Sequence, residues 1–351
     1  MRRKPVALRC SQRFATVAVS VYWAADRHRT NLVVRLLVSA VFLVAAGSMQ
    51  TSAKLAEKYV APRTFWGHPD LTGVYSNNDG SLIPLERPTE FGPRQIKDLS
   101  PADLERINEQ RASRFKDTIA GFGSTLFAGS FDRTNRRPWL IVDPPDGRVP
   151  PLTPEGQERL QHPPRGASRN NKPNGPFDGY KDLGLYDRCV TRGIPDSMIP
   201  VGYGSNYEII QTRDLMAIRY EMIHEVRVIP LDGRSHVGKN LRLDLGDARG
   251  RWEGDSLVVE TTNFASRSAF RGSSEHLRLT ERFTPTAPGN IEWMVTLNDS
   301  QTWTRPWTFA LTLTRQDESQ RVYEYACHEG NYSLRNILSG ARSADHAHQE
   351  K

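Results

Sequence analysis

The stretch that decides the fold class is LMAIRYEMIHEVRVI, residues 215–229 of a 351-residue chain. Its apolar side chains recur at every second position, and charged side chains fall between them. Successive side chains of a β-strand point to opposite faces, so this alternation predicts one long strand with an apolar and a charged face. The predicted inward row is Met216, Ile218, Tyr220, Met222, His224, Val226 and Val228, and the predicted outward row is Arg219, Glu221, Glu225 and Arg227.

The same period of two extends along the C-terminal half, where turn residues rather than helices separate the apolar runs. Strands are predicted at Tyr207–Gln211, Leu215–Ile229, Ser256–Asn263, Leu277–Phe283, Ile291–Leu297, Phe309–Thr314 and Val322–Cys327, with earlier ones at Leu71–Tyr75 and Trp139–Val142. This pattern predicts a mainly β protein. Its antiparallel meander closes as a calycin or lipocalin-like barrel or, as the alternative, folds as a β-sandwich.

The segment before these strands is punctuated by proline. Residues 54–200 are predicted to be loop-rich and to wrap around the strands, with two or three short helices. Ser100 and Thr153 each precede a proline, the typical start of a helix, and predict helices from there to about Phe115 and Gln161. The main strands occupy 201–342, and 343–351 are predicted to be a disordered tail.

Residues 1–53 are predicted to be a leader that contains a signal peptide. Arginines precede an apolar core at Leu36–Ala46, and small residues follow it up to Ala53. The core is shorter than the roughly 20 apolar residues of a spanning helix, which disfavours the alternative of a membrane anchor. We therefore expect a periplasmic or secreted protein without stable membrane insertion after cleavage.

The net positive charge of the chain is confined to this leader. The chain has 47 Lys and Arg against 40 Asp and Glu, and residues 1–53 hold eight of the basic residues and one of the acidic ones. The remainder is therefore neutral, which removes the main support for a nucleic-acid partner.

Two cysteines, Cys189 and Cys327, remain once the leader with Cys10 is removed. A pair with none left over in an oxidising compartment predicts a disulfide, with two buried free thiols as the alternative.

Several longer strings carry a resemblance to a known family. They are PDLTGVY (69–75), LERP (85–88), IVDPPDGRVPPLTPE (141–155), YEMIHEVRVIPLDGR (220–234), GRWEGDSLVVETTNF (250–264), FRGSSE (270–275), WTRPW (303–307) and YEYACHEGNY (323–332). From about Pro62 to Arg342 the chain resembles a family of exported bacterial proteins without an established activity, which usually has Trp at the position of Tyr75. The resemblance implies a signal peptide followed by a single domain, 54–351, and no particular reaction.

The common catalytic signatures are absent from the sequence, including the nucleophile elbow, HExxH, CxxC, the phosphate loop and the dinucleotide fingerprint. No cofactor is therefore expected. Two His and a carboxylate could bind Zn or Fe, but no local pair of ligands supports a metal site.

Acid–base residues instead interrupt the predicted apolar rows. His224 lies on the row described above, Glu281 follows Leu279, and Glu324 and His328 flank Ala326. An inward carboxyl group in apolar surroundings has a raised pKa, which suits proton transfer near neutral pH. His224 is the expected base, Glu281 or Glu324 the acid or orienting partner, and His328 a second acid–base group. The expected ligand-binding residues are Tyr220, Asn263, Trp293 and Trp307.

Two alternatives stay open for these residues. Each polar group can be a hydrogen-bonded part of the core or a strand-end partner of an arginine. A single β-bulge would also exchange the two faces and bring Glu221, Arg227 and Glu260 inward.

Together these features predict a cofactor-independent exported enzyme that acts on a small apolar molecule by acid–base chemistry, as an isomerase, lyase or lactone hydrolase does. The alternative is a periplasmic lipocalin-like binding protein of the same fold without catalysis. A structural envelope protein is disfavoured because the sequence has no repeats.

Overall fold

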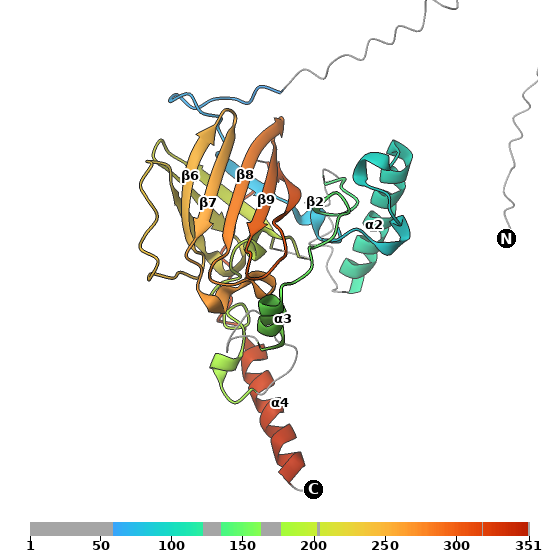
Figure 1. Ribbon diagram of the computed structural model, residues 1–351, viewed down its shortest axis with the longest axis vertical. Helices are drawn as coiled ribbons and strands as arrows, with labels where there is room; N and C mark the ends of the chain where they lie inside the picture. The colour runs from blue at the N-terminus through green and yellow to red at the C-terminus, as the bar shows by residue number, and fades with distance from the viewer. Residues whose placement is uncertain (1–58, 122–134, 163–176, 202–203, 318, 350–351) are drawn as a thin grey trace, which may run out of the picture. The chain divides into compact units, whose positions relative to one another are not determined.

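The computed structural model describes residues 59–121, 135–162, 177–201, 204–317 and 319–349. The predicted leader therefore lies outside the described residues. Ten strands form one sheet (Figure 1). They are β1 (Gly73–Ser76), β2 (Ile141–Asp143), β3 (Asn206–Gln211), β4 (Leu215–Tyr220), β5 (Val226–Pro230), β6 (Asp247–Glu253), β7 (Ser256–Thr262), β8 (Arg278–Ala287), β9 (Asn290–Asn298) and β10 (Trp307–Arg315).

The sheet is a nearly closed antiparallel barrel, as the alternation predicts. Its strand order is β5-β4-β3-β1-β10-β9-β8-β7-β6, with β2 paired to β10 beside this path. Neighbours in sequence pair as a meander, and β1 joins the first meander to the last by pairing with both β3 and β10. The inward side chains of these strands form one large apolar core, in which Trp293, Phe309 and Leu297 are fully buried.

The path without β2 has nine strands, and this odd number leaves one seam in the ring. Each hydrogen-bonded pair on the path is antiparallel, so the two end strands, β5 and β6, run in the same direction. The connection 231–246 must consequently return along the length of the barrel before β6 begins. At the seam, the backbone of β6 lies close to Leu231, which follows the last residue of β5. A Cβ atom added to Gly250 would lie only 2.4 Å from Leu231 Cδ2.

In the described part of the chain, three α-helices accompany the barrel: α2 (Pro101–Gly121), α3 (Pro154–Gln161) and α4 (Tyr332–Gln349). Thr153 caps α3 by accepting a hydrogen bond from Gly156 N, as the sequence predicts. Arg159 of α3 donates to Thr302 Oγ1, which ties α3 to the end of the barrel where β9 ends and β10 begins. We call this end the α3 rim; α3 lies beneath the strands in Figure 1.

The long predicted strand 215–229 is wrong in one respect, because it is a hairpin. A 3-10 turn, Met222–His224, separates β4 from β5, and Ile223 takes a left-handed conformation (φ 66°). The turn changes the alternation, so Tyr220 and Arg227 both face inward. Arg227 is inward, as the alternative of exchanged faces expected, but a turn rather than a β-bulge is the cause, and the Glu260 side chain stays outside at 43% exposure. Of the inward and outward rows predicted for 215–229, only the residues before the turn lie on the predicted faces; in β5 the two faces are exchanged.

Two predictions near the C-terminus are also wrong. The segment Val322–Cys327 is not a strand, because it leaves the sheet to reach its disulfide partner. Residues 343–349 are not a disordered tail but the end of α4, whose Leu334, Ile337, Leu338 and Ala341 recur with helical spacing. Among the described residues, no helix is long and apolar enough to cross a membrane.

The predicted disulfide is present. Cys189 and Cys327 have their Sγ atoms at bonding distance, 1.95 Å, and their Cα atoms 5.8 Å apart. The bond links the segment before β3 to the segment after β10 at the α3 rim.

Candidate functional site

Three predicted site residues meet inside the barrel. Glu281 Oε1 accepts a hydrogen bond from Trp293 Nε1 (3.1 Å), and Glu281 Oε2 accepts one from Arg227 Nη2 (2.5 Å). Arg227 also donates to Thr261 Oγ1 (2.7 Å). The Tyr220 hydroxyl is buried beside Arg227 without hydrogen-bond geometry, and burial raises its pKa. The interior thus holds an ion pair between strands β5 and β8.

This interior network is sealed from solvent. The side chains of Arg227 and Glu281 are 2% and 0% exposed. Burial alone would lower the pKa of Arg227, but attraction to Glu281 outweighs it and raises that pKa. Glu281 therefore faces inward as predicted, but its carboxylate is held by protein donors. The arrangement joins strands and has no route to a substrate from solvent.

The remaining predicted residues lie elsewhere. Trp307 is buried among aromatic rings. Its ring centroid lies 5.6 Å from that of Trp303 and 6.1 Å from that of Phe309. Glu324 and His328 are exposed in the segment between β10 and α4, so their predicted inward placement is wrong. The side chain of His224 lies outside the described residues. Asn263 sits at the α3 rim, where β7 ends.

The sequence analysis missed a group of polar residues at the α3 rim. Thr191 Oγ1 donates to Glu225 Oε2 (2.7 Å) and accepts from Gly193 N (2.8 Å). Burial is the main cause that raises the pKa of Glu225 to about 7. Burial also raises the pKa of Asp196 to about 6, against the opposing charges of Arg192 and Arg271. Two carboxyl groups at this rim are thus poised to exchange protons near neutral pH.

A small crevice opens beside Thr191, Arg192 and Asp196. It has a volume of ≈ 10 Å³, room for about one water-sized group. Its polar lining includes Thr191, Arg192 and Asp196, and its apolar lining includes Ile194 and Phe270. Arg192 Nη1 is buried with no hydrogen-bond partner among the described residues. The crevice therefore offers an unused donor and a carboxyl group within an apolar surround.

Backbone strain gathers around the same rim. Four non-glycine residues of the described chain have positive φ: Cys189, Ile223, Asn263 and Arg271. Cys189 precedes Thr191 by two residues, Ile223 precedes Glu225 by two, and the charge of Arg271 acts on Asp196. Such conformations are costly and gather at functional sites when the surroundings enforce them.

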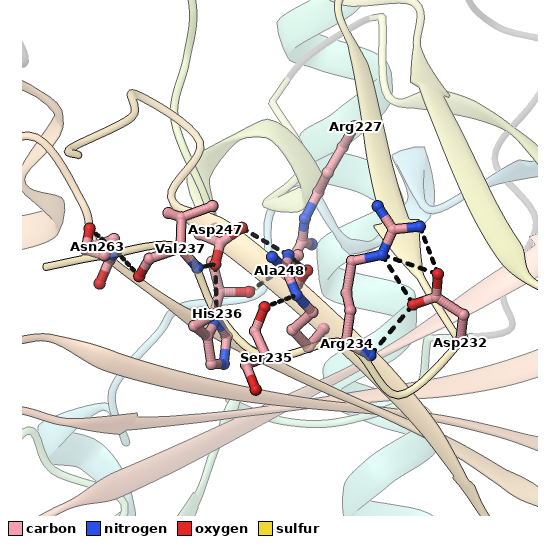
Figure 2. Close-up of polar contacts among 12 residues, drawn as sticks. Arg227, Asp232, Arg234, Ser235, His236, Val237, Asp247, Ala248 and Asn263 are labelled. Atoms are coloured by element: carbon pink, nitrogen blue, oxygen red, sulfur yellow. Dashed lines mark hydrogen bonds and ion pairs between the residues drawn. The ribbon is translucent and has the colours of Figure 1, made fainter.

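A second polar group lies near the start of β6 (Figure 2). His236 Nδ1 is 2.9 Å from Asp247 Oδ2, and Asn263 holds the adjoining loop through Val237 O (3.1 Å) and Gly238 O (3.2 Å). His236 is outside every predicted strand, so no alternation singled it out. Within the described part of the chain, no group of three or more His, Cys, Asp or Glu is arranged to hold a metal ion.

Comparison with known proteins adds no assignment. No family model matches the chain. No curated protein matches it either.

Proposed function

We propose that this protein is an exported enzyme that performs acid–base chemistry on a small, largely apolar organic molecule, with the crevice at the α3 rim as its active site. The observation that carries the proposal is the composition of the crevice. The unpartnered Nη1 of Arg192 and the Asp196 carboxyl group line the same space, together with Ile194 and Phe270. Because the crevice has room for about one water-sized group, it fits the oxygen-bearing end of a small molecule whose apolar body lies outside it.

Each polar residue then has a role. Arg192 Nη1 donates to a carbonyl oxygen of the substrate and stabilises the negative charge that develops there. Asp196 takes a proton from the adjacent carbon and returns it, as isomerisation or elimination requires. Glu225 exchanges protons with the crevice through the hydroxyl of Thr191, which it contacts at 2.7 Å. Glu281, expected from the sequence to take part, is assigned to the ion pair inside the barrel.

Export is supported by two features. Cys189 and Cys327 lie at disulfide distance, which fits an oxidising compartment. The apolar core at Leu36–Ala46 has the length and flanks of a signal peptide.

The test is exchange of an α-proton. Phenylacetone, a small apolar ketone, is incubated with the protein in D2O, and loss of its α-proton signal is followed by NMR. Wild-type protein should accelerate the exchange, and Asp196→Asn should slow it by about 10²–10⁴-fold. Arg192→Met should weaken phenylacetone binding and slow exchange as well. The matched control is Asp232→Asn, because Asp232 belongs to an ion pair with Arg234 at the opposite end of β5.

The outcomes separate the alternatives. Exchange that is lost in Asp196→Asn and kept in Asp232→Asn supports the enzyme. Binding of phenylacetone by the wild type without exchange supports the binding protein instead. Equal activity of Asp196→Asn and wild type refutes the assignment of the crevice.

A further inference from the structure

The pair formed by His236 and Asp247 has the geometry of a catalytic base and its orienting group. His236 Nδ1 lies 2.9 Å from Asp247 Oδ2 (Figure 2). The Asp247 side chain is 7% exposed, whereas that of His236 is 30% exposed. A buried carboxylate thus contacts one ring nitrogen of an imidazole that is itself partly exposed to solvent.

Asp247 does not depend on His236 for its hydrogen bonds. Its Oδ2 also accepts from Val237 N (2.9 Å), and its Oδ1 accepts from Arg249 Nη1 (2.6 Å). Burial alone would raise the pKa of Asp247, but the hydrogen bonds from Val237, His236 and Arg249, together with the charge of Arg249, outweigh it and lower that pKa. Asp247 is therefore ionised, and a neutral His236 must carry its proton on Nδ1 to donate to it.

This tautomer leaves the other ring nitrogen as an acceptor. Among the described residues, none makes a hydrogen bond or ion pair to His236 Nε2; the ring contacts Asp247 through Nδ1. The imidazole is thus oriented by a buried carboxylate and presents a lone pair toward solvent. A nucleophile or water with its proton directed at Nε2 would be activated.

The loop that carries His236 is fixed from two strands. Asp247 is the first residue of β6, and Asn263 follows the last residue of β7. Asn263 adopts the left-handed conformation (φ 59°), donates to Val237 O and Gly238 O, and accepts from Leu243 N (2.9 Å). Asn263, expected from the sequence to bind ligand, positions the loop that lies along the seam through these hydrogen bonds.

We infer that His236 and Asp247 form a second acid–base site at the seam of the barrel, one that hydrolyses small activated carboxylic esters from solvent. Nε2 takes a proton from water while the water oxygen bonds to the ester carbonyl carbon, whose π electrons move to its oxygen. The intermediate collapses with cleavage of the bond to the alcohol oxygen, which receives the proton from Nε2. The products are a carboxylic acid and an alcohol, and Asp247 stabilises the imidazolium between the two steps.

This inference is independent of the proposed function, since it involves neither Asp196 nor Arg192. The result of the α-proton exchange experiment with Asp196→Asn therefore has no bearing on the ester hydrolysis by His236. Failure of the ester hydrolysis would likewise leave the proposed role of the crevice unchanged.

The test uses 4-nitrophenyl acetate and measures release of 4-nitrophenolate at pH 7.5. His236→Gln should lower the protein-catalysed rate by about 10²-fold or more, the lower end of the effect of general acid–base catalysis. The matched control is His162→Gln. His162 Nδ1 lies 3.0 Å from Glu158 Oε1, but both side chains are more than 70% exposed, so this pair lacks the buried carboxylate. The control should keep the wild-type rate.

A second measurement separates catalysis from a merely structural role. Nitrogen-15 NMR of the histidine rings should show His236 protonated on Nδ1 at pH 7.5. In Asp247→Asn, the preference for this tautomer and the ester rate should fall together, with folding verified by thermal denaturation. An unchanged rate in His236→Gln, an equal loss in His162→Gln, or an Nε2-protonated ring in the wild type would each overturn the inference.

Discussion

The buried ion pair between Arg227 and Glu281 leads to the sharpest prediction for stability. The two side chains are 2% and 0% exposed, and Arg227 Nη2 contacts Glu281 Oε2 at 2.5 Å. Arg227→Met leaves the carboxylate with one hydrogen bond, from Trp293. Removal of one partner from a buried pair typically costs about 3–5 kcal/mol, because the other charge stays buried without compensation. We expect a loss of this size for Arg227→Met and for Glu281→Leu.

The double variant Arg227→Met/Glu281→Leu should be more stable than either single variant. It removes both charges, and apolar replacement of a buried pair is often neutral or stabilising. The measurement is urea denaturation followed by tryptophan fluorescence, with the free energy of unfolding extrapolated linearly to water. The control is Arg282→Met, since Arg282 pairs with Glu253 on the outer face at 41% and 39% exposure and should contribute less than about 1 kcal/mol.

The pH dependence gives the same prediction a second test. In Arg227→Met, the buried Glu281 side chain loses its cationic partner, and burial without a partner disfavours the charged form of a carboxyl group. The folded state then binds the proton more tightly, so the variant should be most stable below the unfolded pKa and lose stability as pH rises. Additive single effects, or a loss below 1 kcal/mol in Arg227→Met, would refute the reasoning.

Three further predictions follow from other parts of the chain. The disulfide joins residues 138 positions apart, so loop entropy predicts that its reduction costs about 5 kcal/mol, which urea midpoints of oxidised and of reduced, alkylated protein will measure. Asp196 and Glu225 have folded pKa values of about 6 and about 7, above their unfolded values near 4. Their protonated forms favour the folded state at low pH, and stability should fall as pH rises from about 4 to 7. Asp196→Asn and Glu225→Gln should flatten this slope in thermal denaturation, and an unchanged slope in both contradicts the assignment. Finally, N-terminal sequencing from the native host should find a mature chain that begins near Lys54; an intact Met1 in the cytosol would exclude export.

The alternation of residues along the chain was sufficient to predict most of the barrel. The strand predicted at Ser256–Asn263 matches β7 (Ser256–Thr262), and Ile291–Leu297 lies within β9 (Asn290–Asn298). A strand with one buried face carries its orientation in its own side chains, so Glu281 could be placed inward without tertiary information. The cysteine count similarly predicted the bond between Cys189 and Cys327.

Alternation failed where the backbone departs from an extended strand. Met222 to His224 continue the apolar period of Met216 to Tyr220, yet they form a turn in which Ile223 has positive φ. Nothing in that run marks the turn, because the conformation is enforced by pairing of β4 with both β3 and β5. The reversal of faces that brings Arg227 to Glu281 follows from this turn.

The candidate sites depended on tertiary structure alone. Thr191, Asp196 and Glu225 are far apart or in irregular segments, and no periodicity relates them to one another. His236 meets Asp247 because the connection from β5 must return along the barrel to start the parallel neighbour β6. Local side-chain pattern determines which residues form strands and which face is buried. Which distant loops meet at a rim depends on how the sheet closes into a barrel. The nine strands of the path leave one seam between β5 and β6, and a long connection must run along that seam.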